Sequence, residues 1–126
     1  IYQYGIRSGD KSEFVWGKEH VFTQKFDLEG LDETLRALAG KPVYLTVDLD
    51  VLDPSVFPGT GTPEPGGVSF DALRAALTKA CSLDVVAADV NELSPHYDTS
   101  GASTAAACKI VREMLISLGA HRRGQN

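Results

Sequence analysis

The sequence predicts an α/β protein built in three layers (αβα), with a mostly parallel β-sheet between helices on either side. Apolar runs typical of buried strands alternate along the chain with amphipathic helical patterns, and this order implies right-handed β-α-β crossovers. The run at residues 42–47 is apolar and β-branched with little alternation, as in a strand buried on both faces. A length of 126 residues with 43% hydrophobic side chains suits one compact domain.

The beginning of the chain is expected to contain two short strands and a helix. Residues 2–6 alternate apolar and polar side chains like a strand, and residues 21–23 suit a brief edge strand. Residues 13–20 are compatible with either a helical turn or an irregular loop. At residues 28–39 leucines recur at spacings of three and four, and Gly40 is placed to end that helix.

A long irregular segment separates this part from the next helix and strand. Residues 48–67 hold four of the six prolines and four of the twelve glycines, which excludes a helix or a central strand. Long loops of this kind are usually functional. Ser69 is a suitable N-cap for a helix ending near Ala80, and residues 83–90 form the next predicted strand.

The last helix is expected at residues 103–118, with Gly119 ending it. We therefore expect one domain over residues 1–120 and a frayed tail at residues 121–126. Helical spacing places four apolar side chains on the predicted buried face of this helix: Cys108, Val111, Leu115 and Leu118.

The composition argues against several kinds of partner and location. Lys and Arg number 12 against 17 Asp and Glu, and the net charge of −5 disfavours nucleic acid or an anionic membrane as the main partner. No apolar run approaches the roughly 20 residues needed to span a bilayer, and no signal-peptide pattern is present. Because Cys81 and Cys108 are the only cysteines, we expect free core thiols in a cytoplasmic protein. The strand-like start at Ile1 indicates a piece of a longer protein.

The first chemical motif is Asp48-Leu49-Asp50, directly after the apolar strand. Side chains two apart in a strand share a face, so both carboxylates are expected to project together, roughly 6–7 Å apart. Such a pair stays ionised only if a cation or strong donors lie between the carboxylates. Carboxylate oxygens favour Mg²⁺, Ca²⁺ or Mn²⁺, and Mn²⁺ is preferred if imidazole joins them. The alternative is that both aspartates cap loops or pair with arginine or lysine.

A rigid loop rich in proline and glycine follows at residues 58–67. Its threonine hydroxyls and backbone amides are suited to approach a small ligand closely, because no bulky side chain intervenes. The alternative is a structural loop that only covers the sheet.

The second motif is the polar segment at residues 89–98, at the exit of the next strand. Since the carboxyl ends of parallel strands share one edge of a sheet, we expect both motifs to meet there. Glu92 is suited to hold a cationic substrate by paired charge-assisted hydrogen bonds. His96 is compatible with an ordinary exposed loop histidine, and Asp98 with a loop cap.

These residues resemble the ureohydrolase (arginase/agmatinase) family, and the resemblance covers nearly the whole chain. It implies a partial arginase-like fold, corresponding to the C-terminal half of such an enzyme. Residues 92–98 and 101–104 are most similar to bacterial agmatinases. The segments that carry the family resemblance are residues 2–8, 47–54 and 58–63 and the pair Gly66-Gly67.

The resemblance also implies roles for individual residues. Asp48 and Asp50 correspond to catalytic aspartates that bind a pair of Mn²⁺ ions. Glu92 corresponds to the carboxylate that orients the substrate guanidinium, and Thr62 to a loop threonine beside the substrate. Asn91 departs from the small apolar residue usual before that glutamate, which bears on fine specificity.

The activity implied by the resemblance is hydrolysis of a small guanidinium substrate, with agmatine giving putrescine and urea. Arginine and guanidinobutyrate remain open as substrates, and relatives assemble as trimers and hexamers. The metal-binding histidine and the Asp-x-His-x-Asp segment of the family are absent from this sequence, so the chain alone is expected to be inactive. Two alternatives remain, namely a non-catalytic folded fragment or assembly module, and a small Mg²⁺-dependent phosphotransfer domain.

Overall fold

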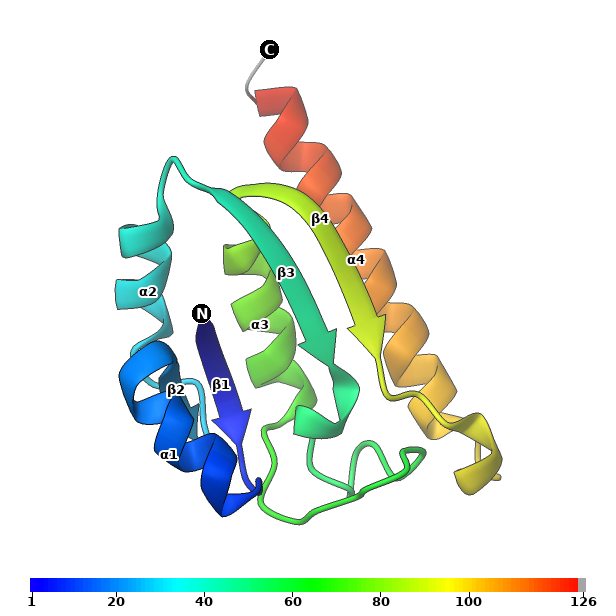
Figure 1. Cartoon of the computed structure of the whole chain (residues 1–126). Coiled ribbons are helices and arrows are strands. Elements are labelled where there is room, and N and C mark those ends of the chain that lie inside the picture. Colours follow the sequence, from blue (N-terminus) through cyan, green and yellow to red (C-terminus); the bar gives the residue numbers. More distant parts are fainter. Residues whose placement is uncertain (125–126) are drawn as a thin grey trace.

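A computed structural model describes residues 1–124 and shows an α/β protein (Figure 1). No helix within this part of the chain is both long and apolar enough to cross a membrane. The elements in chain order are β1 (Tyr2–Ile6), α1 (Lys11–His20), β2 (Phe22–Lys25), α2 (Leu31–Leu38), β3 (Pro42–Asp48), the 3₁₀ turn η1 (Leu49–Val51), α3 (Phe70–Ala80), β4 (Asp84–Asn91), the 3₁₀ turn η2 (Pro95–Tyr97) and α4 (Ala102–Gly124).

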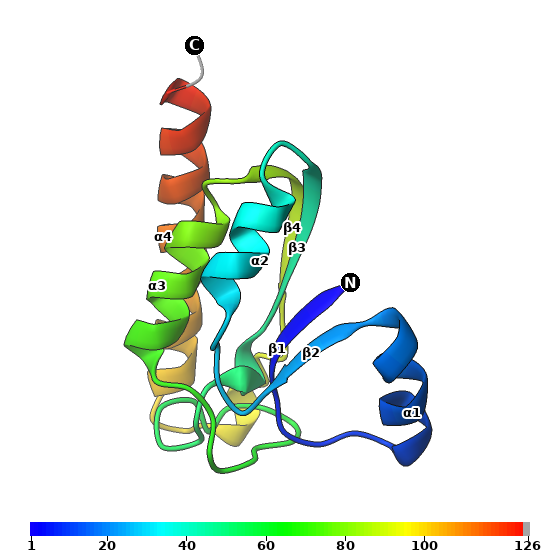
Figure 2. The same ribbon diagram turned by 90° about the vertical axis from the view of Figure 1, so that its left-hand side faces the viewer.

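The strands form two parallel pairs, β1 with β2 and β3 with β4. Each pair is one β-α-β unit, closed through α1 in the first and through α3 in the second. Helices α2, α3 and α4 lie on one side of the strands, whereas α1 lies on the other side beside β2 (Figure 2). The predicted α/β class with parallel strands is confirmed, and hydrogen bonds divide the strands into two pairs rather than one continuous sheet.

One face of the β3–β4 pair carries the core and the other is exposed. Val47 is buried toward the helices. Tyr44 of β3 and Val86 of β4 are 63% and 60% exposed on the opposite face of the strand pair. The expectation that residues 42–47 are buried on both faces is therefore wrong within the described chain, because helices cover only one side. The core contains Phe57, Leu49, Leu52, Ile110 and Cys81, all nearly or completely inaccessible to solvent.

Local side-chain caps explain where the helices begin. At α1, which the sequence left undecided, Asp10 and Glu13 form a reciprocal capping box, and this stabilises a full helix. Ser69 accepts a hydrogen bond from the Ala72 amide at 3.2 Å, as predicted for the N-cap of α3. The helix predicted from residue 28 begins instead at Leu31, after Gly30 turns the backbone with a φ of 78°.

The predicted buried face of the last helix is wrong for three of its four side chains, and only Leu118 packs against the core. Ser103, Ala107, Ile110 and Met114 are buried, whereas Val111 and Leu115 are 39% and 66% exposed. Cys108 is also exposed, so only Cys81 is the expected core thiol, and both cysteines are free. Two apolar stripes run along this helix, and contact with the rest of the fold selects the one containing Ile110.

The end predicted for this helix is also wrong. Gly119 does not terminate α4, which continues to Gly124, so residues 121–124 are helical rather than a frayed tail. A glycine inside a helix costs only about 1 kcal/mol relative to alanine, which the surrounding helix can tolerate. Residues 125–126 of the expected tail lie outside the described residues.

Candidate functional site

The two predicted motifs meet at the carboxyl ends of β3 and β4. The two strands are in register to their last residues, where Asp48 is the partner of Asn91. Asp50 follows in η1, and Glu92 comes directly after β4. The strand ends and the connecting loop lie together along one edge of the molecule (Figure 1). Parallel pairing thus brings together three acidic residues that are separated in sequence.

The local geometry of the aspartate pair differs from the expected one. Asp50 lies in a 3₁₀ turn rather than in the strand, so the expectation that both carboxylates project from one face of an extended strand is wrong. Asp48 caps this turn, since its Oδ1 accepts a hydrogen bond from the Asp50 amide at 3.2 Å. The capping alternative is therefore realised for Asp48, and the two carboxyl groups still lie near enough for Asp50 to raise the pKa of Asp48 by charge repulsion.

The pKa of Asp48 is raised above its ordinary value at this site. Although Asp48 keeps an exposed surface, desolvation by the surrounding protein raises its pKa to about 6. The hydrogen bond from the Asp50 amide opposes this shift, and repulsion from the Asp50 and Glu92 carboxylates adds to it. No arginine or lysine within residues 1–124 forms an ion pair with either aspartate. The oxygen donors suit a hard divalent cation such as Mn²⁺.

These carboxylates make only part of a ligand set. Within the described residues, no group of three or more His, Cys, Asp or Glu side chains is arranged to hold a metal ion. Asp48 and Asp50 supply two carboxylates of the kind that bind a divalent cation, but within residues 1–124 they do not make a complete ligand set.

Glu92 is held in an unusual backbone conformation at this edge. Its φ of 67° lies in the left-handed region, which residues other than glycine rarely adopt. Two residues later, the Ser94 amide donates to the Gly59 carbonyl at 2.8 Å and ties the exit of β4 to the irregular loop. A strained acidic residue kept in place by neighbouring contacts is typical of a binding site.

The irregular loop brings Thr62 to the aspartate pair. The Thr62 hydroxyl lies 3.3 Å from Oδ2 of Asp50, where it can donate a hydrogen bond. Thr60 is buried, and its hydroxyl has no hydrogen-bond partner within residues 1–124. The loop therefore does more than cover the sheet, because one of its threonines contacts the acidic site directly.

Asp53 holds both ends of this loop. Its Oδ1 accepts from the Ser55 amide at 3.0 Å, and its Oδ2 accepts from the Gly66 and Gly67 amides at 2.8 and 3.3 Å. Hydrogen bonds from Ser55 and Gly66 lower the pKa of Asp53 to about 2. The contact of Asp53 with the two glycines spans 13 and 14 residues and was not predicted from the sequence.

We expect this carboxylate to stabilise the fold in a pH-dependent way. Because the pKa of Asp53 falls from 3.8 to about 2 on folding, its stabilisation is present above pH 4 and is lost as pH falls toward 2. Urea denaturation should show Asp53→Asn less stable than the native chain at pH 7, with the difference shrinking between pH 4 and 2. Asp84→Asn, at the exposed start of β4, is the matched control. A difference that stays constant with pH would contradict this assignment.

The end of the second motif has a structural role. The Asp98 carboxylate accepts from the Ser100 hydroxyl at 2.6 Å and from the Ser103 amide at 2.7 Å, and these bonds hold its pKa well below the usual range. Ser103 in turn accepts a hydrogen bond from the Gly59 amide at 2.8 Å. Asp98 is thus a loop cap, as its alternative interpretation stated. His96 is exposed, and its ring lies against the Tyr97 ring at an interplanar angle of 43°.

Sequence reasoning missed a polar network on the exposed face of β3 and β4. Asp89 accepts hydrogen bonds from Tyr44, from Thr46 at 2.8 Å, and from Asn91. Thr46 and Asp89 are direct partners across the two strands, so only the strand register reveals the network. The unusual Asn91 therefore contributes to this network beside Asp48.

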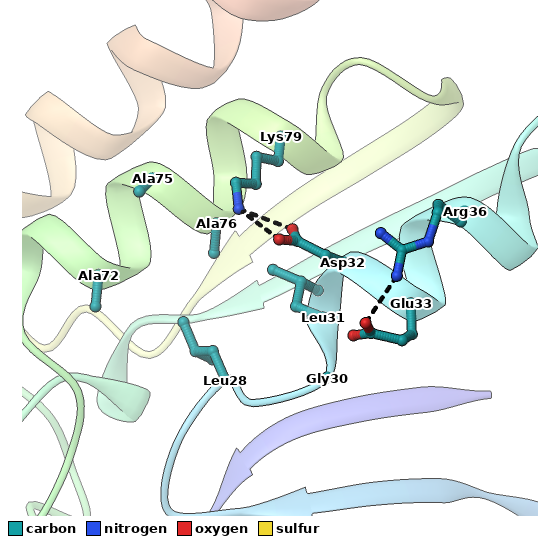
Figure 3. A pocket seen from close by; sticks show the side chains of 10 residues that line it. All are labelled: Leu28, Gly30, Leu31, Asp32, Glu33, Arg36, Ala72, Ala75, Ala76 and Lys79. Carbon is teal, nitrogen blue, oxygen red and sulfur yellow. Dashed lines mark hydrogen bonds and ion pairs between the residues drawn. The ribbon is translucent and has the colours of Figure 1, made fainter.

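A separate pocket of about 320 Å³ lies between α2 and α3 (Figure 3). Its charged side chains are paired with one another, Lys79 with Asp32 at 2.7 Å and Arg36 with Glu33 at 2.7 Å. Alanines of α3 and Leu28 and Leu31 form its apolar wall. Because these charged side chains bind one another, the pocket offers a ligand no unpaired charge, in contrast to the acidic residues at the ends of β3 and β4.

Parallel strands with clustered carboxylates at their carboxyl ends define an α/β protein with an acidic cluster at the strand exits. The sequence matches the Arginase family over residues 1–117. The agmatinase of Bacillus cereus is 49% identical over 120 residues, which are 92% of this chain and 41% of that protein. The chain therefore belongs to the arginase family, and it spans about two fifths of the length of this curated relative.

Solved structures agree with the family assignment. The agmatine ureohydrolase of Thermoplasma volcanium superposes with a TM-score of 0.85 at 30% identity, over 100% of this chain and 44% of its own. The proclavaminate amidino hydrolase of Streptomyces clavuligerus superposes with a TM-score of 0.82 at 33% identity, over 95% of this chain and 43% of its own. The partial parallel fold seen here is thus a contiguous part of a larger family fold.

Proposed function

We propose that this chain supplies part of a binuclear manganese ureohydrolase centre that hydrolyses agmatine to putrescine and urea. The observation that carries this proposal is the meeting of Asp48, Asp50 and Glu92 at the ends of β3 and β4, in a chain of the arginase family. Agmatine is favoured because Bacillus and Thermoplasma relatives bear that activity in their names.

Each residue has a distinct role in this proposal. Asp48 and Asp50 would hold manganese, which would supply an activated water nucleophile near neutral pH. Glu92 accepts hydrogen bonds from the substrate guanidinium and orients its carbon for attack. Water adds to that carbon and gives up a proton to one of the aspartates, the bond to the alkyl nitrogen breaks, and the same aspartate passes that proton to the leaving amine. Thr62 stands beside the reacting groups and orients the Asp50 carboxylate.

The chain alone is inactive in this proposal, since two carboxylates are an incomplete ligand set. The remaining ligands belong to the part of the enzyme that relatives have in addition to these residues. We further propose a cytoplasmic enzyme, with residues 1–120 forming one part of a single α/β domain and the intact enzyme assembling as a trimer or hexamer.

A hybrid enzyme tests the proposal. We expect Bacillus cereus agmatinase, with its matching 120 residues replaced by those of this chain, to release urea from agmatine in the presence of Mn²⁺. Asp48→Asn should lower the rate at least about a hundredfold, because it removes a charged metal ligand. Asp84→Asn, at the opposite end of β4, is the matched control and should leave the rate unchanged.

Two results would contradict the proposal. One is a folded, metal-loaded hybrid that releases no urea, and the other is urea release that survives Asp48→Asn. Urea release from the isolated 126-residue chain would refute the proposed inactivity.

The alternative, a non-catalytic assembly module, is favoured by the exposed Tyr44 and Val86 face and predicts self-association of the chain in sedimentation.

A further inference from the structure

Arg7 links the end of β1 to the turn that carries Asp50. It directly follows Ile6, the last residue of β1, and its Nη1 donates a hydrogen bond to the Val51 carbonyl at 2.9 Å. Its Nη2 donates to the Asp50 carbonyl. Both acceptors are main-chain carbonyls of η1, so one side chain holds two consecutive peptide groups of this turn.

The environment of this guanidinium is unusual for an arginine. Arginine commonly pairs with carboxylates, yet Arg7 forms no ion pair within residues 1–124. Its Nε is buried and has no hydrogen-bond partner in the same part of the chain. A half-buried cation whose hydrogen bonds go to the backbone of one turn acts on the conformation of that turn.

Packing on the same side of the turn supports this interpretation. Gly5 has a φ of 74°, and a Cβ there would lie 2.3 Å from Cγ2 of Val51. Because β1 and β3 belong to different hydrogen-bonded pairs, no strand ladder joins them among the described residues. The end of β1 therefore reaches the β3 exit through side-chain contacts, in which Arg7 provides the hydrogen bonds.

We propose that Arg7 is a positioning residue for the acidic site, fixing η1 so that the Asp50 carboxylate faces Asp48. The planar guanidinium sets both the place and the tilt of the turn, because two parallel N–H groups bind two carbonyls. The Val51 carbonyl also accepts from the Val68 amide at 2.9 Å, so Arg7 joins β1, the turn and the irregular loop. We call the two hydrogen bonds from Arg7 to η1 the clamp. The role of the aspartates as metal ligands rests on the proposed function, but the clamp does not.

Hydrogen exchange of the ¹⁵N-labelled 126-residue chain tests the clamp without metal. The reporting amides are those of Asp50, bonded to Asp48 at 3.2 Å, and Leu52, bonded to the Leu49 carbonyl at 3.1 Å. Hydrogen bonds from a charged group contribute enough that Arg7→Gln should speed exchange at both amides on the order of tenfold to a hundredfold. Arg7→Lys should give partial rescue, since an ammonium keeps the charge but not the fork.

Arg36→Gln is the matched control, because Arg36 is exposed on α2 and pairs with Glu33. Amides of α3 should keep their native exchange rates in the Arg7 variants. Unchanged exchange at Asp50 and Leu52, or an equal acceleration in α3, would overturn the proposal. Should Arg7→Gln not fold, the Arg7→Lys comparison decides by the same criteria.

Mn²⁺ titration of the same labelled chain separates this proposal from the proposed function. Native chain should show line broadening centred on Asp48 and Asp50, and Arg7→Lys should need on the order of tenfold more Mn²⁺ for equal broadening. Absence of broadening in the native chain would count against the aspartates as metal ligands, while the exchange result would still decide the clamp. Equal Mn²⁺ requirements despite faster exchange would overturn the link between the clamp and metal binding.

Discussion

Gly67→Ala is expected to lower the free energy of unfolding by about 3 kcal/mol or more, at the upper end of the cost of overpacking. A Cβ at this position would lie 2.5 Å from the Asp53 nitrogen and the Leu52 carbonyl carbon, and 2.6 Å from the Val51 oxygen. All three are main-chain atoms, so no flexible side chain can move aside. The clash separates two segments that are joined by the Leu52–Val68 bridge.

Urea denaturation followed by circular dichroism measures this effect. Gly61→Ala is the matched control in the same loop, because a Cβ there would meet nothing within 4 Å and should change stability by less than about 0.5 kcal/mol. The Gly67 amide also donates a hydrogen bond to the Asp53 carboxylate, so we expect Gly67→Ala to weaken this hydrogen bond as well. Equal stability of the two alanine variants would show that the loop backbone relaxes freely at Gly67.

Elements whose signals are local could be predicted from the sequence. The helix at Phe70–Ala80 follows from the Ser69 cap and from apolar spacing, and both motifs were correctly placed at strand exits. The spacing of Asp48 and Asp50 does not determine how their side chains are oriented, because two aspartates separated by one residue fit either a strand or a 3₁₀ turn. Only the observed turn shows that Asp48 caps the backbone of Asp50.

Features that depend on distant contacts could not be predicted. On α4, Ile110 and Leu115 are both strongly apolar, and only packing against the rest of the fold makes one 0% and the other 66% exposed. Arg7 lies 43 residues before Asp50 and binds main-chain carbonyls. Because every residue has a main-chain carbonyl, the sequence does not indicate which ones Arg7 binds. The network around Asp89 likewise requires the register of β3 with β4.

Phe57→Ala is expected to destabilise the chain by about 3–5 kcal/mol, the usual cost of removing a fully buried aromatic side chain. Phe57 is 0% exposed and belongs to the core cluster, although it lies in the irregular loop between η1 and α3. Its amide donates to the Asp53 carbonyl at 3.0 Å, so its ring anchors the Asp53 turn to the core.

Phe26→Ala provides the comparison, because that ring is 58% exposed and its removal creates no internal cavity. We expect a change below about 1 kcal/mol there, measured by the same urea titrations. If Phe57→Ala proved equally mild, the loop would have to refold around the lost ring without support from the core. The expected large difference instead means that the buried Phe57 ring, together with the hydrogen bonds of Asp53, holds the loop that reaches the acidic site in its shape.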